Sequence, residues 1–233
     1  MSLEKPPRIE KKPQMEVAPL GSLENPIIDS NMSEEEALRP NPKFKIPAEI
    51  FEQQALITIK YLSFDGKYHQ GQVVMDKRLK KDVEDFFAFL IQQKFPVNKA
   101  VPVAHRAYEF DDDKSMLDNN ASGFNPRVKV GPVGGSSELS KHSLGWALDV
   151  NPKINPYFGG EGKIPVTPIK PEDSGEAGVV EYYNIDKSGT ITPWIAKFLI
   201  ERGWTWGLSW HSEENPRVDI HHFEKTLGEI PKV

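Results

Sequence analysis

The stretch SKHSLGWALDVNP, residues 140–152, holds a histidine and an aspartate seven residues apart, with a glycine between them. Gly145 permits a tight turn, which would fold the His142 imidazole back toward the segment that carries Asp149. If that segment is a strand, alternation places the apolar Leu148 on one face and Asp149 on the other. We therefore expect the apolar face to meet the core and the Asp149 carboxylate to point away from it, near His142.

A second cluster of metal-binding residue types lies near the C-terminus, in RVDIHHFE, residues 217–224. This segment holds Asp219, His221, His222 and Glu224 within six residues. Histidine nitrogens and carboxylate oxygens are good zinc ligands. In a strand, His222 and Glu224 would share one face and His221 would lie on the other. Alternation alone leaves open which histidine binds a metal.

The segments around these clusters predict a mixed α+β fold. Residues 55–75 contain two runs of strand type joined at Asp65-Gly66, a dipeptide typical of turns. Residues 77–95 carry apolar side chains at helical spacing, and 193–203 begin with a proline behind a threonine, as helices often do. Because the elements do not alternate strictly, we expect a small antiparallel sheet flanked by helices. Shorter strands are expected at 99–108, 145–151 and 218–224.

Two segments differ in composition from the rest of the chain. Residues 1–47 are rich in proline, glutamate and lysine, so they bury too little apolar surface to order themselves. We interpret them as a linker or a tail that lies over the domain, with one helical turn at 33–42, and residues 48–233 as the domain itself. The Gly/Pro-rich segment 152–190 is too long for a plain connection and suggests a functional rim or an insertion.

The composition excludes several classes of site and partner. The chain of 233 residues has no cysteine, which excludes thiolate catalysis, cysteine-based zinc sites and disulfides. A formal net charge of -5 without a basic cluster argues against nucleic acid as a partner. No run approaches the roughly 18 apolar residues that cross a membrane, so we expect a protein that does not span one.

Both clusters resemble the motifs of a known family. SKHSLGWALDVNP is similar to the S-x-H-x-x-G-x-A-x-D signature of the zinc D-alanyl-D-alanine carboxypeptidase and L-alanyl-D-glutamate endopeptidase group. Residues 203–224, GWTWGLSWHSEENPRVDIHHFE, resemble its closing element, in which Trp-Gly and Trp precede D-x-x-H-F-E. With upstream segments, the resemblance covers roughly residues 50–228. It implies the Hedgehog/DD-peptidase-like fold of that group.

The resemblance implies a zinc ion held by His142, Asp149 and His222, with Asp219 as the general base. Three protein ligands leave a fourth position for a water molecule, whose pKa zinc lowers toward ~7. A neighbouring carboxylate can take the proton and later deliver it to the leaving amine. Read without the resemblance, His142 and Asp149 could be a structural pair, and Asp219 could cap a turn.

Substrate positioning in the family uses an arginine that precedes the first metal ligand, because a guanidinium matches the geometry of a carboxylate. Arg106 falls at that position and Arg127 is a second candidate, although either could form a structural salt bridge instead. Ser140 and Trp210 are further candidates for substrate binding. Relatives often have Trp-Gly-Gly-Asp-Trp where residues 206–210 read Trp-Gly-Leu-Ser-Trp, a departure that bears on specificity.

Together these residues imply a zinc peptidase that hydrolyses peptide bonds in peptidoglycan stem peptides, of the D-Ala-D-Ala carboxypeptidase or the L-Ala-D-Glu endopeptidase type. Two alternatives stay open: a non-catalytic zinc-containing module that binds wall peptides, and a zinc peptidase for other secreted peptides. We expect a monomer in the cell envelope, periplasmic or secreted, whose partners are stem peptides or muropeptides. Because no apolar leader follows Met1, the opening Met-Ser-Leu would replace a removed export signal.

Overall fold

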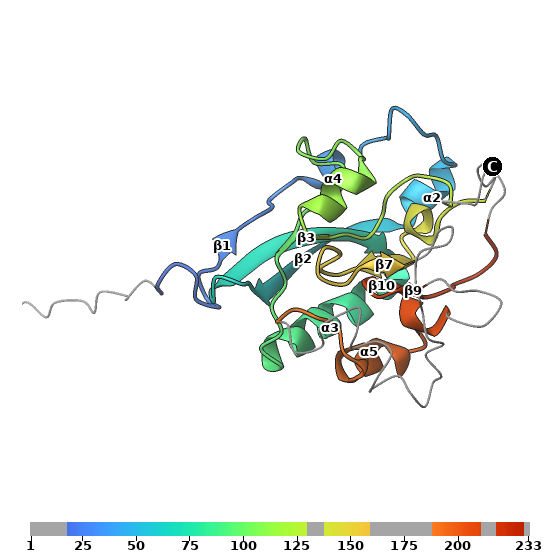
Figure 1. The fold of residues 1–233 in the computed structure, drawn as a ribbon. Helices are drawn as coiled ribbons and strands as arrows, with labels where there is room; N and C mark the ends of the chain where they lie inside the picture. Colours follow the sequence, from blue (N-terminus) through green and yellow to red (C-terminus); the bar gives the residue numbers. More distant parts are fainter. Residues whose placement is uncertain (1–17, 130–137, 159–187, 211–217, 231–233) are drawn as a thin grey trace, which may run out of the picture.

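The computed structural model describes residues 18–129, 138–158, 188–210 and 218–230 (Figure 1). Within them the strands are β1 (Ile27–Ile28), β2 (Gln54–Leu62), β3 (Tyr68–Asp76), β4 (Lys99–Ala100), β5 (Asn120–Ala121), β6 (Ala147–Asp149), β7 (Tyr157–Phe158), β8 (Thr205–Trp206), β9 (Val218–Asp219) and β10 (His222–Glu224). The helices are α1 (Glu34–Ala37), α2 (Ala48–Glu52), α3 (Lys80–Gln92), α4 (Asp112–Leu117) and α5 (Pro193–Ile200). Short 3-10 turns are η1 (Lys77–Leu79), η2 (Lys141–Leu144) and η4 (Gly207–Trp210).

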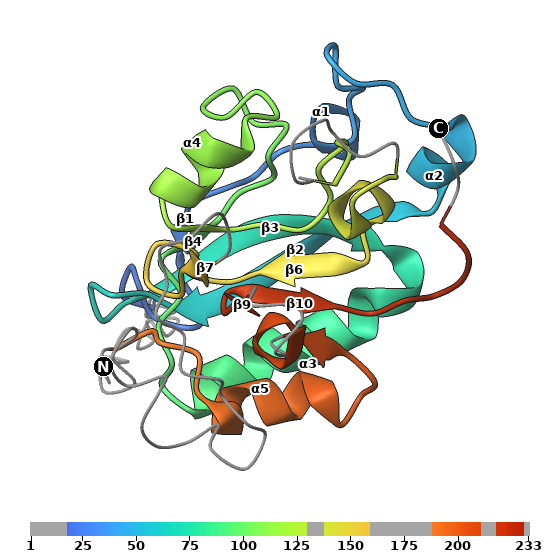
Figure 2. The same cartoon turned by 45° about the vertical axis from the view of Figure 1, so that its right-hand side comes forward.

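The strands form two three-stranded sheets, ordered β1-β3-β2 and β6-β10-β8, and two ladders, β4-β5 and β7-β9. Both views place α2 and α4 on one side of the strands and α3 and α5 on the other (Figure 2). This arrangement confirms the α+β class. The prediction of one small antiparallel sheet was too simple, because β1 pairs with β3 in parallel. None of the helices in the described ranges is long and apolar enough to cross a membrane.

The predicted hairpin is the longest feature of the fold. β2 and β3 pair antiparallel over their whole length, and Gly66 takes the left-handed conformation that the turn requires, with φ +76°. Helix α3, which the apolar spacing predicts, buries the side chains Val83, Phe86, Phe87 and Leu90 in the core that it shares with this hairpin. The hairpin and α3 form the base on which the second sheet is built.

The second sheet brings the two sequence clusters together. β10 lies between β6 and β8, and its register sets His222 opposite Asp149. Phe223 points the other way, into the core, where its ring contacts Phe86 and Trp206. The single strand predicted at 218–224 is in fact two strands, β9 and β10, separated by a turn at 220–221. That turn changes the direction of the chain between Asp219 and His222.

The described part of the N-terminal segment lies against the domain. β1 pairs with β3, and Ser30 donates from its hydroxyl to the buried Gln72 (2.7 Å). The expected helical turn is α1, which begins at a capping box formed by Ser33 and Glu36. Further along, the Arg39 guanidinium donates to the backbone carbonyl of Ala104. The boundary between residues 47 and 48 stays a prediction.

Three other predictions meet the structure with different outcomes. α5 is confirmed, and the Thr192 hydroxyl accepts from the Ile195 N–H at its start. The strand expected at 99–108 was wrong beyond Ala100, because the chain turns at Pro102, whose carbonyl accepts from His105 N–H. Most of the 152–190 excursion lies outside the described residues.

Candidate metal centre

His142 is positioned by a short turn whose two ends are fixed by particular residues. Ser140 begins η2, and its hydroxyl accepts from the His142 N–H. Gly145 ends the turn at φ +65°, a left-handed conformation that favours glycine. The chain then enters β6 directly, and Asp149 follows at its end. The predicted role of Gly145, folding the histidine back toward the strand, is confirmed.

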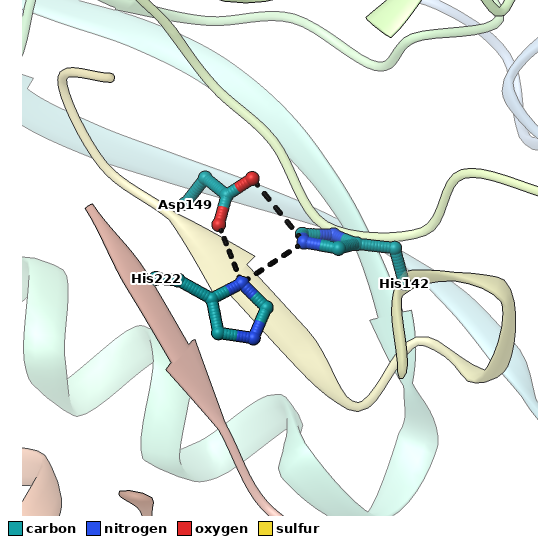
Figure 3. A group of neighbouring side chains, drawn as sticks. All are labelled: His142, Asp149 and His222. Atoms are coloured by element: carbon teal, nitrogen blue, oxygen red, sulfur yellow. Dashed lines mark hydrogen bonds and ion pairs between the residues drawn. The ribbon is translucent and has the colours of Figure 1, made fainter. Parts of the chain in front are cut away.

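The side chains of His142, Asp149 and His222 converge on one point, from η2, β6 and β10 respectively (Figure 3). His142 Nε2 lies 3.2 Å from Asp149 Oδ2, and His222 Nδ1 lies 3.0 Å from Asp149 Oδ1. The two ring nitrogens that face each other are 3.2 Å apart. All three residues are buried, and one ligand atom from each lies within 4.8 Å of the others.

The opposite nitrogen of each histidine is engaged by a hydrogen-bond acceptor. His142 Nδ1 donates to the Gly123 carbonyl (2.7 Å), and His222 Nε2 lies 3.2 Å from Glu224 Oε2. These contacts direct His142 Nε2 and His222 Nδ1 toward Asp149, and acceptors of this kind commonly orient histidines that bind metals. Two imidazole nitrogens and a carboxylate that meet in a buried space suit a divalent cation such as zinc.

The electrostatics of His142, Asp149 and His222 also favour a bound cation. Burial alone would raise the pKa of Asp149, but the charges of His142 and His221 and hydrogen bonds from both ligand histidines hold it well below its usual range. Burial would lower the pKa of His222, but hydrogen bonds to Asp149 and Glu224 outweigh it and raise the pKa to about 10. The carboxylates therefore create a site that favours positive charge at the point where the three side chains meet.

Asp219 and His221 lie beside this group. Asp219 Oδ1 is 3.0 Å from His221 Nε2, which in turn is 4.0 Å from Asp149 Oδ2. His221 Nδ1 donates to the Asn155 carbonyl (2.7 Å), so the ring is held from its far side. Although close, the contact with His221 lacks hydrogen-bond geometry, and Asp219 Oδ1 has no hydrogen-bond partner among the described residues. Burial raises the pKa of Asp219, and His221 and His222 oppose that rise.

The two arginine candidates differ in their surroundings. Arg106 is exposed on the loop after β4, and its side chain makes no hydrogen bond or ion pair with any residue that the structure describes. Arg127 pairs with Asp112 (3.1 Å), which is the structural alternative considered for it. Its backbone also runs along the His142 turn, where its N–H donates to Ser143 Oγ and its carbonyl accepts from Ser140 N–H. Arg127 Nε is buried without a hydrogen-bond partner in the described part of the chain.

The remaining candidates lie close to the three converging side chains. Ser140 is buried and bonds the backbone of His142, as described above. The Trp210 ring packs against His222, with the ring centroids 5.0 Å apart. Leu208, where relatives often have glycine, is buried, whereas Ser209 donates to the Trp206 carbonyl.

Three contributors were missed from the sequence. Gly123 acts through its backbone carbonyl, for which the sequence gives no signal. Asn155 is completely buried, and its amide bonds the carbonyls of Val150, Asn151 and Gly189 while accepting from Ile191 N–H. Tyr157 pairs with Asp219 across the β7-β9 ladder. Both of the latter follow an Asn-Pro break, which predicts only a turn.

Comparison with known proteins agrees with the resemblance. Residues 134–225 match the family model described as D-alanyl-D-alanine carboxypeptidase. No curated protein and no solved structure matches the chain. The matched segment contains all three converging side chains, Asp219 and the Trp210 loop. The segment that carries the converging side chains, residues 134–225, thus matches the D-alanyl-D-alanine carboxypeptidase family.

Proposed function

We propose that this protein is a zinc-dependent peptidase that hydrolyses peptide bonds in peptidoglycan stem peptides, on a Hedgehog/DD-peptidase-like fold. The observation that carries the proposal is the convergence of His142, Asp149 and His222 inside the segment that matches the carboxypeptidase family. Membership of that family indicates a metallopeptidase with peptide substrates. The proposed location is the cell envelope, periplasmic or secreted, and the proposed state is a monomer.

The three ligands would hold zinc through His142 Nε2, an Asp149 carboxylate oxygen and His222 Nδ1. When bound, zinc supplies Lewis acidity and lowers the pKa of water toward neutrality. The contacts with Gly123 and Glu224 keep the donor nitrogens of the two histidines aimed at the same point. Such preorganisation reduces the conformational cost of binding the ion.

Asp219 is the proposed proton carrier. Burial raises the pKa of the Asp219 carboxyl toward neutral pH. A pKa nearer to neutral favours a group that must both accept and release a proton. During hydrolysis it accepts a proton from the attacking water. It then delivers that proton to the amine as the C–N bond breaks. His221 Nε2 lies 3.0 Å from Asp219 Oδ1 and is a polar neighbour of this carboxylate.

Arg106 is the better of the two candidates for binding a substrate carboxylate or the developing oxyanion. Its guanidinium is exposed, whereas that of Arg127 is paired with Asp112. For Arg127 we propose a supporting role beside the His142 turn. Ser140 contributes by fixing that turn, and Trp210 forms a wall next to His222.

The proposal is tested by digesting purified muropeptides with zinc-loaded protein and identifying the new termini by mass spectrometry. The termini distinguish a D-Ala-D-Ala carboxypeptidase from an L-Ala-D-Glu endopeptidase, and a mixture with ordinary peptides tests the broader alternative. Asp219→Asn should retain one zinc and lose about 100-fold or more in kcat. Asp85→Asn, an exposed change on α3, is the matched control.

Two results would count against the proposal. Unchanged hydrolysis by Asp219→Asn would remove Asp219 from the role of base. Stoichiometric zinc and peptide binding without any turnover by the wild-type protein would favour the non-catalytic module.

A further inference from the structure

Tyr157 occupies an unusual place beside the proposed proton carrier. In the antiparallel β7-β9 ladder its Cα partner is Asp219, and directly opposed residues project from the same face. The face on which Asp219 projects is that of the metal centre, because its carboxylate contacts His221, which in turn lies close to Asp149. The Tyr157 side chain therefore emerges next to the Asp219 carboxylate, on the side of the metal centre.

The exposed fraction of the side chains increases from the metal centre through Asp219 to Tyr157. The metal-binding side chains are almost completely buried, and the Asp219 side chain is 14% exposed. Tyr157 is 46% exposed, which makes it the outermost member of this row. Among the described residues, its hydroxyl has no hydrogen-bond partner. A half-exposed aromatic ring with a free donor is typical of a residue that contacts a ligand.

The backbone that carries Tyr157 is held firmly. Asn155 and Pro156, the two residues before it, accept through their carbonyls from His221 Nδ1 and the Ile220 N–H respectively. The buried side chain of Asn155 ties the same segment to the end of β6 and to the chain at 189–191. Tyr157 therefore stands on a preorganised support, at a fixed position relative to Asp219.

We propose that Tyr157 recognises the residue that leaves in the reaction, with its hydroxyl donating to the free C-terminal carboxylate of the substrate. This inference rests on the proposed function. Asp219 delivers its proton to the leaving amine, so its neighbour on the exposed side lies next to the leaving residue. A phenol can donate to a carboxylate, and its ring can pack against the methyl group of alanine. Tyr157 thereby favours cleavage of the terminal residue.

The test compares wild-type protein with Tyr157→Phe and Tyr157→Ala, using a stem peptide that ends in D-Ala-D-Ala and the same peptide amidated at its C-terminus. Tyr157→Phe should raise KM for the free acid about 10-fold, because one hydrogen bond to a charged group is lost. It should leave kcat and the KM of the amide within about 2-fold. Tyr157→Ala should weaken the binding of both peptides, because the ring is also lost.

Binding of the same peptides is measured by calorimetry in zinc-loaded Asp219→Asn protein, with and without Tyr157→Phe. This measurement needs no turnover, so a failure of the proposed function shows as absent hydrolysis by wild-type protein and is distinguished from a failure of the Tyr157 proposal. Tyr68→Phe, at the hairpin end of β3, is the matched control. Equal affinity for the free acid with and without Tyr157→Phe would overturn the proposal.

Discussion

His142 Nε2 and His222 Nδ1 lie 3.2 Å apart, although they are 80 residues apart in the chain, and both contact the carboxylate of Asp149. Each ring is held by an acceptor at its other nitrogen, so the pair cannot turn away from the shared point without losing a hydrogen bond. A cation between the two nitrogens would satisfy both lone pairs together. This geometry therefore favours binding of a metal ion.

The two neighbouring histidines should respond differently to substitution. His222→Ala removes a ligand, and its zinc affinity should fall by more than the roughly 10–100-fold typical of losing an outer partner. His221→Ala should keep one zinc per chain and lose kcat, because His221 lies 3.0 Å from Asp219 and is not one of the three converging side chains. Competition with a chromogenic chelator measures the affinity. Loss of zinc in His221→Ala with retention in His222→Ala would reverse the assignment.

Glu224 should determine zinc affinity without touching the ion. Its carboxylate lies 3.2 Å from His222 Nε2 and aims the other nitrogen at Asp149. Glu224→Leu should weaken zinc binding by about 10–100-fold, and Glu224→Gln by less, since an amide oxygen still accepts from the ring. Glu201→Leu, an exposed change at the end of α5, serves as the control. If Glu224→Leu binds zinc as tightly as the wild type, the supporting role is wrong.

The sequence predicts those parts of the site that depend on local geometry. The turn at Gly145 and the histidine–aspartate spacing follow from backbone sterics and from one short strand, so the position of His142 near Asp149 could be expected. The hairpin and α3 were likewise visible in the apolar periodicity. The pairing of His222 with Asp149 came only from the family resemblance, because strand register depends on contacts between distant segments.

The remaining features depend on tertiary contacts that carry no local signal. The segment 218–224 reads as one strand, yet the turn at 220–221 splits it and brings both His221 and His222 to the site. Asn155 is a polar residue immediately before a proline, and its burial reflects four carbonyl and amide groups that the fold gathers around it. Likewise, β1 forms because the exposed edge of β3 supplies hydrogen-bonding groups, which composition alone cannot show.

Gly145 should tolerate no side chain, for two separable reasons. Its φ of +65° costs an L-residue about 1–2 kcal/mol, and an added Cβ would overlap Gln54 Oε1 and lie 2.6 Å from Asp76 N. Gly145→Ala should therefore destabilise the protein by about 1–3 kcal/mol more than Gly66→Ala, which has a φ of +76° and open space around it. Urea unfolding measures both changes. Equal costs would show that the contact is relieved easily.

The part of the N-terminal segment that the structure describes should contribute to stability. β1 covers the edge of β3, and Met32, Phe44 and Ile46 pack against the core. Removal of residues 1–47 should lower the urea midpoint, because the β1 pairing and these apolar contacts are lost. A stable and fully active 48–233 fragment would instead support the domain boundary predicted from composition.

Asp76 should stabilise the fold in a way that depends on pH. Burial alone would raise its pKa, but hydrogen bonds from Arg78 and Trp146 lower it below the ordinary 3.8. The unfolded chain therefore binds this proton more tightly than the native one. The resulting stabilisation is fully present above the unfolded pKa and is lost as pH falls through the folded pKa.

Asp76→Asn should accordingly cost about 2 kcal/mol at pH 7, and the cost should shrink below about pH 4 as the wild-type carboxylate takes up its proton. Urea unfolding at a series of pH values measures the difference. Asp85→Asn, which disrupts only the exposed pair with Lys81, should change stability by less than ~0.5 kcal/mol throughout. A penalty that stays the same on acidification would show that Asp76 acts through packing and not through its charge.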